Sequence, residues 1–180
     1  MPVAQNIQQF YKVAQDRDFS RDFLFRVTQL QLQGVPALRD DELVYVKTAS
    51  LPGRNISDVS VPYMGLDFHV PGSVKYPGSD GYELTFYLDG QSVLRNYFET
   101  ASRSLFNDET STGAYGTPGL ESYIVLEQID KEFNTVPNGA YKLVGASLRN
   151  INAVAYDIAA GTGATVQINT TIAYHYYTVL

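Results

Sequence analysis

The feature that most constrains the fold is a two-residue alternation along Thr165–Val179. Val166, Ile168, Thr170, Ile172, Tyr174 and Tyr176 alternate there with Gln167, Asn169, Thr171, Ala173 and His175. Such a period predicts a β-strand with two different faces, and this one exceeds the usual length of about five or six residues. It contains no Lys or Glu, although exposed strand edges are usually protected by charge, proline or bulges. The pattern predicts a strand covered by another strand, either in the chain's own sheet or in a sheet that continues across a subunit boundary.

Composition supports a mainly β chain. The 14 Tyr and 9 Phe among 180 residues, with many Val, Ile and Thr, suit a pleated, half-buried surface. The length predicts a single domain over residues 1–180. The absence of Cys excludes zinc ribbons, iron–sulfur sites and thiol nucleophiles, and the net charge of −6 argues against a protein that grips DNA. We expect no membrane-spanning segment, because no window approaches about 18 apolar residues, and no secretory signal.

The expected strands are short and separated by turns. They cover residues 22–32, 43–49, 56–63, 66–70, 82–88, 122–130, 140–149 and 153–157, before the final strand over 165–179. Met64-Gly65 between two of them predicts a long hairpin. Pro62 and Pro71 cannot donate to a sheet, so they are expected at strand ends or edges.

Two segments have helical periodicity. Ile7, Phe10, Tyr11 and Ala14 predict a short amphipathic helix within an N-terminal arm over residues 1–18, docked on the domain or on a neighbouring copy. Gln91–Phe106 is the firm internal helix, with Asp89 or Ser92 as its N-terminal cap. We expect an acidic loop at residues 40–42 and a mobile loop insertion at 107–119.

No constellation of residues predicts an enzyme. His69 and His175 lie in strand patterns and are interpreted as packing residues rather than as parts of a catalytic triad. Glu127, Asp130 and Glu132 include carboxylates that could face each other, but spacing alone does not define a catalytic pair. No metal-ligand spacing or phosphate-binding loop is present, so we expect no catalytic residues, metal or cofactor.

The order of several short motifs resembles the tail tube proteins of contractile-tailed bacteriophages. The motifs are Lys47–Arg54, Val61–Gly65, Val70–Gly72, Leu84–Tyr87 and Val93–Glu99, with Phe23–Val27 before them and a hairpin from Val154–Asp157 to Thr165–Thr178 after them. No single motif is diagnostic, and together they cover about 80% of the chain. The arm and the insertion at 107–119 depart from the pattern.

The resemblance implies a rolled antiparallel β-sandwich or barrel with one flanking α-helix. It further implies hexameric rings, whose sheets join across subunits and which stack into a hollow tube inside a contractile sheath. The implied partners are further copies of the chain, the sheath, tape measure, baseplate and terminator proteins. Double-stranded DNA would pass through the lumen without specific binding. The implied location is the tail tube of a virion, assembled in the host cytoplasm.

Under this resemblance, two strand regions become candidates for the lumen wall or a subunit contact. They are Gln167, Asn169 and Thr171 of the final strand, and Ile56, Ser60 and Asp67 of the hairpin. Arg54 and Arg95 are candidates for charges that bridge subunits, with single solvated charges as the alternative.

Three other functions stay open at this level. The chain could be a tube initiator or terminator at a tube end, or the inner tube of a phage-like injection system. From a different class, it could be a β-sandwich binding module, which would not form rings.

Overall fold

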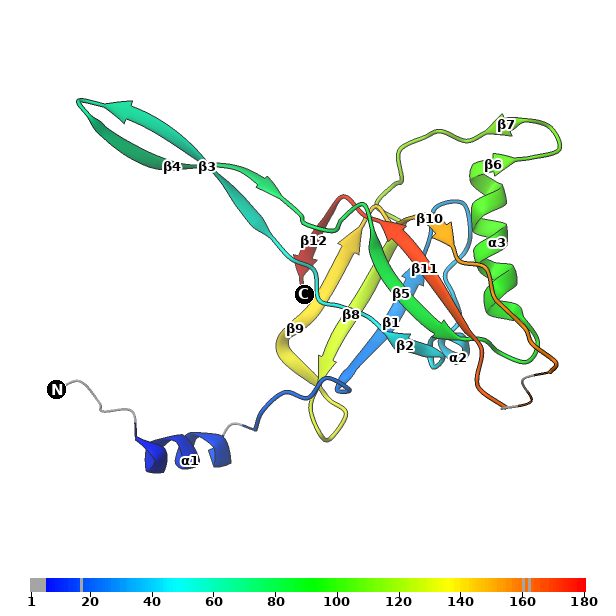
Figure 1. Ribbon diagram of the computed structural model, residues 1–180, viewed down its shortest axis with the longest axis horizontal. Coiled ribbons are helices and arrows are strands. Elements are labelled where there is room, and N and C mark those ends of the chain that lie inside the picture. Colours follow the sequence, from blue (N-terminus) through cyan, green and yellow to red (C-terminus); the bar gives the residue numbers. More distant parts are fainter. Residues whose placement is uncertain (1–5, 17, 160, 162) are drawn as a thin grey trace.

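The computed structural model describes residues 6–16, 18–159, 161 and 163–180 (Figure 1). Within them the helices are α1 (Ile7–Asp16), α2 (Asp40–Leu43) and α3 (Val93–Leu105). The strands are β1 (Phe25–Gln31), β2 (Val46–Thr48), β3 (Asn55–Tyr63), β4 (Leu66–Lys75), β5 (Tyr82–Tyr87), β6 (Phe106–Asn107), β7 (Thr112–Gly113), β8 (Tyr123–Ile129), β9 (Thr135–Val144), β10 (Ser147–Ile151), β11 (Gln167–Ala173) and β12 (Tyr176–Val179).

Two four-stranded antiparallel sheets form the body of the molecule. Their strand orders are β1-β8-β9-β12, called here the β8 sheet, and β10-β11-β5-β2, called the β11 sheet. The predicted mainly β sandwich with a flanking helix is confirmed. Among the described residues the two sheets do not close into a barrel.

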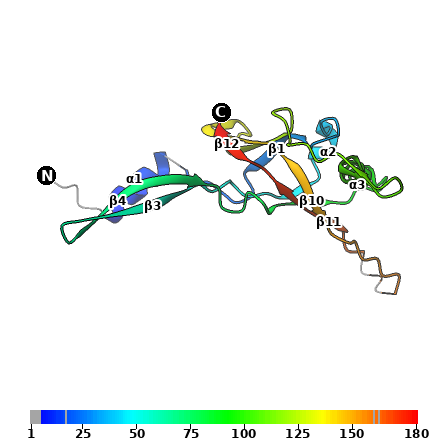
Figure 2. The same ribbon diagram turned by 90° about the horizontal axis from the view of Figure 1, so that it is seen from above.

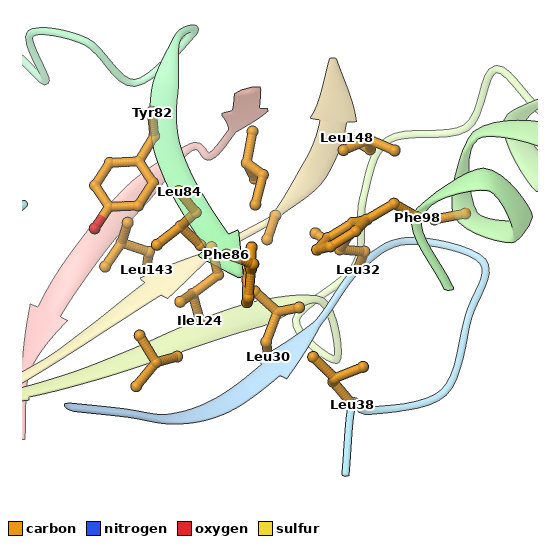
Figure 3. Close-up of a cluster of buried hydrophobic side chains, with 14 of the residues drawn as sticks. Leu30, Leu32, Leu38, Tyr82, Leu84, Phe86, Phe98, Ile124, Leu143 and Leu148 are labelled. Carbon is orange, nitrogen blue, oxygen red and sulfur yellow. The ribbon is translucent and has the colours of Figure 1, made fainter. Parts of the chain in front are cut away.

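The core lies between the two sheets. Leu30, Ile124 and Leu143 from the β8 sheet join Leu84 and Phe86 of β5 in one buried cluster (Figure 3). All five side chains have no exposed surface. Alternate residues of each strand therefore supply the apolar layer, as the period-two pattern predicts.

Helix α3 closes one side of this core. Its buried residues are Leu94, Phe98 and Ala101, and the Phe98 ring lies 5.2 Å from the Phe86 ring between centroids. Of the two predicted caps, Asp89 is the one that acts. Its carboxylate accepts hydrogen bonds from the backbone N–H groups of Val93 (2.8 Å) and Leu94 (3.2 Å), whereas the Ser92 side chain makes no capping bond.

Two long strands predicted from the sequence are each divided in the structure. The segment 165–179 becomes β11 and β12, which belong to different sheets. At the bend, the Tyr174 N–H donates to the Ser79 carbonyl and the His175 N–H to the Val144 carbonyl. Ala173 and Tyr174 are both buried and Tyr176 is exposed, so burial changes phase at the bend. The alternation in the sequence runs through this point unbroken and conceals the bend.

The predicted strand over 140–149 is divided in the same way, at Gly145. This residue has a φ of +77°, which favours glycine, and it separates β9 from β10. The segment β9–β10 passes from the β8 sheet to the β11 sheet, and the segment β11–β12 passes back. Each of the two segments therefore contributes one strand to each sheet.

Two smaller expectations are wrong. Residues 40–42 are not a loop but begin α2, where the Glu42 carboxylate accepts the Arg39 N–H at 2.8 Å. The segment 153–157 contains no strand. The loop at 107–119 carries the small β6–β7 hairpin, and the Gln33 side-chain amide donates to the Gly116 carbonyl at 2.8 Å.

Two elements project from the body. The predicted hairpin forms as β3 and β4, which, in the part of the chain that the structure describes, pair only with each other. Pro62 and Pro71 therefore lie on edge strands, as expected. Helix α1 of the predicted arm forms as well and has no buried residue. Both elements extend to the same side of the body in two perpendicular views (Figures 1 and 2). Part of the predicted arm, residues 1–5 and Arg17, lies outside the described residues.

Candidate assembly surfaces

The outer face of the β11 sheet carries polar side chains along its middle. Gln167 and Asn169 are exposed and Thr171 is half-buried, while Ile168, Thr170 and Ile172 between and beside them are buried. Strands β10 and β5 occupy both edges of β11. The uncharged strand is thus covered within its own sheet, which was one of the two alternatives predicted from its sequence.

Neighbouring strands extend this polar surface. In register, Gln167 lies opposite Tyr87, Asn169 opposite Thr85, and Thr171 opposite both Glu83 and Asn150. We call these seven residues the polar sheet face. Residues directly opposite each other in an antiparallel pair share a face, so the predicted residues Gln167, Asn169 and Thr171 form its central row.

Charge is confined to the margins of the polar sheet face. At one end, the Lys47 ammonium donates to the Gln167 side-chain carbonyl at 3.0 Å and lies 5.7 Å from the Tyr87 ring centre. At the other end stands Glu83. The centre, around Asn169 and Thr85, presents amide and hydroxyl groups only.

The β3–β4 hairpin has one apolar face. The cross-strand pairs Val59–Val70, Val61–Phe68 and Tyr63–Leu66 place six apolar residues on it, called here the apolar hairpin face. Each of these residues is between 46% and 65% exposed. A contiguous apolar patch of this kind on a soluble protein is typical of an interaction site.

The opposite side of the hairpin is polar. Ser60 lies opposite His69, and Asp67 lies opposite Pro62. The Asp58 carboxylate is 2.6 Å from His69 Nδ1, with both side chains more than half exposed. The predicted residues Ser60 and Asp67 therefore share this polar side, whereas Ile56 lies opposite Val74 nearer the body, beyond an irregularity in the register.

The two candidate arginines differ in their surroundings. Arg95 is engaged within the chain: its guanidinium donates to the Glu99 carboxylate at 2.7 Å and to the Asn152 carbonyl at 2.9 Å. Arg54 is exposed and directly precedes β3, at the base of the hairpin.

The acidic residues suggested by the sequence do not converge on a common site. Glu127 on β8 accepts hydrogen bonds from Arg26 of β1 (2.8 Å) and from Thr135 of β9 (2.8 Å). Partial burial raises the pKa of Glu127, but these bonds and the charge of Arg26 outweigh it and lower the pKa below its usual range. Asp130 instead shapes the β8–β9 turn, where the N–H groups of Asn134 and Glu132 donate to it and lower its pKa.

Both histidines lie on the surface of the molecule. His69 and His175 are exposed, so the expectation that both are packing residues is wrong.

Two tyrosines, by contrast, are hydrogen-bonded within the fold. Burial raises the pKa of Tyr82 and of Tyr97 to about 12, so both phenols remain neutral donors. Tyr82 donates to the Ser50 carbonyl and Tyr97 to the Pro36 carbonyl.

Within the described residues, no group of three or more His, Cys, Asp or Glu side chains could hold a metal ion. No helix there is long and apolar enough to cross a membrane.

Reasoning from the sequence missed the apolar hairpin face. It selected Ile56, Ser60 and Asp67 from the hairpin and passed over the six apolar residues. The signal was available, because Val59, Val61 and Tyr63 alternate on one side of the turn and Leu66, Phe68 and Val70 on the other. Sequence periodicity separates two faces of a strand but does not show which face lacks a cover.

Comparisons with known proteins show where this fold occurs. No protein-family model matches the sequence, and no curated protein matches it. Among the solved structures that match, three share the fold over 91% of this chain. The first is a chain of the anti-feeding prophage baseplate, a sixfold-symmetrised assembly, with a TM-score of 0.60, 14% identity and 97% of that chain covered.

The other two come from the terminal parts of such particles. A chain of the anti-feeding prophage tube-terminating cap matches with a TM-score of 0.57 and 12% identity, with 92% of that chain covered. A chain from the sheath and tube terminator of an extracellular contractile injection system matches with a TM-score of 0.56 and 10% identity, with 98% covered. At these identities the likeness concerns the fold, and the chain shares that fold with structural components of contractile injection systems.

Proposed function

We propose that this chain is a structural, ring-forming subunit at an end of the central tube of a contractile tail or phage-like injection system, as an initiator or a terminator. The observation that carries the proposal is the shared fold over 91% of the chain with three chains from baseplate, terminator and cap structures. In each case more than nine-tenths of the other chain is covered, so the likeness extends to the whole subunit.

In this proposal the chain forms a hexameric ring. The anti-feeding prophage baseplate structure that it matches is sixfold-symmetrised. A ring needs a head-to-tail contact between two different surfaces of one subunit. The β11 sheet ends in edge strands β10 and β2, which can pair with edge strands of neighbouring copies and so join the sheets around the ring.

The polar sheet face is the proposed lumen wall, with Gln167, Asn169 and Thr171 at its centre. DNA carries one negative charge per roughly 1.7 Å of axis and is gripped by rows of Lys and Arg. The central row has neither, so it allows DNA or another cargo to slide without specific binding. Ser60 and Asp67, on the polar side of the hairpin, extend the same kind of surface.

The proposed partners follow from this position. They are further copies of the chain, the adjoining tube or baseplate ring, the sheath around the tube and the tape measure protein within it. The exposed Arg54 at the base of the hairpin is the better placed of the two candidate arginines for a bridge between subunits, since Arg95 is engaged within its own chain. The assembled location is a tail or injection particle, put together in the host cytoplasm. The structural role requires no catalytic residues.

A second candidate is the main inner tube, in which the same rings stack on themselves. The small, uncharged centre of the polar sheet face favours it, because a long conduit repeats its wall many times and any attraction for the cargo would accumulate.

Negative-stain electron microscopy of the purified protein over a range of concentrations tests both candidates. Discrete rings that cap tube ends but do not elongate support a tube-end subunit, and hollow tubes support the main tube. Monomers that persist after a baseplate or tube seed is added overturn both and favour the binding module.

A further inference from the structure

Helix α1 carries a second uncovered apolar surface. Its stripe consists of Ile7, Phe10, Tyr11 and Ala14, of which the first three are between 58% and 69% exposed. Phe10 stacks on Phe19 with 5.9 Å between ring centroids, so the helix is tied to its own linker rather than to the body. An isolated helix of ten residues is marginal in water, and a lone two-stranded hairpin is equally marginal.

The stripe and the apolar hairpin face match in chemistry and in length. Neither contains a charged residue. Ten helical residues span about 15 Å, and the five hairpin residues Val59–Tyr63 span about 17 Å. One helix laid along the hairpin would cover its apolar face and complete a layer of helix on sheet, the usual way to bury two such faces.

Within one chain the two surfaces are apart. No hydrogen bond, ion pair or ring contact joins α1 to β3 or β4 among the described residues, and Figure 1 shows the helix and the hairpin separated on the same side of the body. The arm leaves the body near the β8–β9 turn, where the Gln128 side-chain amide donates to Ser20 Oγ at 2.7 Å. The hairpin instead leaves from the β11 sheet, between β2 and β5.

We propose that, in the assembled ring, α1 of one copy packs across the apolar hairpin face of the adjacent copy. The inference rests on the proposed ring. Two different and complementary surfaces on one chain are what a head-to-tail contact requires, because each copy then offers the helix to one neighbour and the hairpin to the other. The arm thus links consecutive subunits.

Thiol cross-linking between two differently labelled proteins tests this contact. The chain has no native Cys, so Ala14→Cys in one protein and Val61→Cys in the other provide the only thiols. The two proteins are mixed at a ring-forming concentration and treated with a short bismaleimide. We expect a covalent dimer that contains one copy of each protein.

Each matched control moves one thiol to the opposite face of the same element. Asp16→Cys replaces Ala14→Cys and places the thiol on the side of α1 opposite the stripe. Ser60→Cys replaces Val61→Cys and places the thiol on the polar side of the hairpin. Either control is expected to reduce the yield of mixed dimer by about tenfold or more, because only the contacting faces hold two thiols at a high effective concentration.

Electron microscopy of the same samples separates this inference from the proposed function. Rings with the mixed dimer support both. Rings without it, or with equal yields from the control variants, overturn the helix–hairpin contact and leave the ring proposal standing. Absence of both rings and mixed dimer overturns both, and a cross-link only within a chain that carries both Ala14→Cys and Val61→Cys shows that the arm covers its own hairpin instead.

Discussion

The sandwich body and the projecting elements follow opposite rules of burial. In the body, β5 alternates buried and exposed residues, and its buried row is covered by the β8 sheet and α3. In the hairpin, the same alternation produces an apolar row that nothing in the described chain covers. The comparison teaches that the body covers its own apolar layer within one chain, whereas the apolar faces of the hairpin and α1 are suited to cover by another molecule.

The largest expected effect separates the two regions by stability. Phe86→Ala should lower the free energy of unfolding by about 3–5 kcal/mol, because it leaves a cavity in a fully buried cluster. Phe68→Ala, the matched change on the apolar hairpin face, should alter it by less than about 0.5 kcal/mol. Urea unfolding of the dilute protein measures both. Equal losses would show that the hairpin is part of the body's core.

Assembly should show the reverse sensitivity. Val61→Asp places a carboxylate in the proposed subunit contact, where an unpaired buried charge costs several kcal/mol, so the ring fraction should fall by about tenfold or more. Ser60→Asp, one residue away on the polar side, should leave it nearly unchanged. Size-exclusion chromatography with electron microscopy gives the ring fraction. Normal rings from Val61→Asp would remove the apolar hairpin face from the interface.

The polar sheet face is tested by changing its charge. Asn169→Lys adds one positive charge per copy at the centre of the proposed lumen wall, and its rings should bind double-stranded DNA with an affinity that falls steeply with salt. Wild-type rings should not bind DNA measurably, and neither should the Asn169→Lys protein before it assembles into rings. Fluorescence anisotropy at several salt concentrations is the readout. Variant rings that ignore DNA, or loss of the rings themselves, would contradict the lumen position.

The smallest effect concerns Glu127 in the body. Its pKa is lowered in the folded state, so its ionised form stabilises the protein above the unfolded pKa of about 4.5, and this stability is lost as the pH falls through the folded pKa. Glu127→Gln should therefore remove about 0.5–1 kcal/mol at pH 7 and flatten the dependence of stability on pH below about 5. Thermal unfolding at pH 3–7 measures this. A variant with an unchanged pH profile would show that the Arg26 contact contributes nothing.

The sequence was sufficient for most of the body and insufficient where three-dimensional context decides. Alternation predicted β5, β8 and the hairpin, and Asp89 was correctly among the expected caps of α3. The bend at Tyr174 could not be predicted because the alternation in the sequence runs through it unbroken, although burial changes phase there. Gly145 could not be distinguished from a tolerated glycine without its positive φ. For the candidate surfaces, the row Gln167, Asn169 and Thr171 was correctly grouped on one face. Ser60 and Asp67 were identified as candidates, but the apolar hairpin face on the opposite side of the same two strands was not. Periodicity separates the two faces of a strand, but it does not show which face no other element covers.

Hydrogen exchange, measured by mass spectrometry on the dilute monomer and on the assembled protein, tests the central claim most directly. We predict that amides of β3, β4 and α1 exchange rapidly in the monomer and slow down on assembly, while those of β5 and β8 are protected in both states. If β3, β4 and α1 gain no protection on assembly, or if they are already as protected in the monomer as β5 and β8, the projecting elements are not completed by a neighbouring copy and the account is wrong.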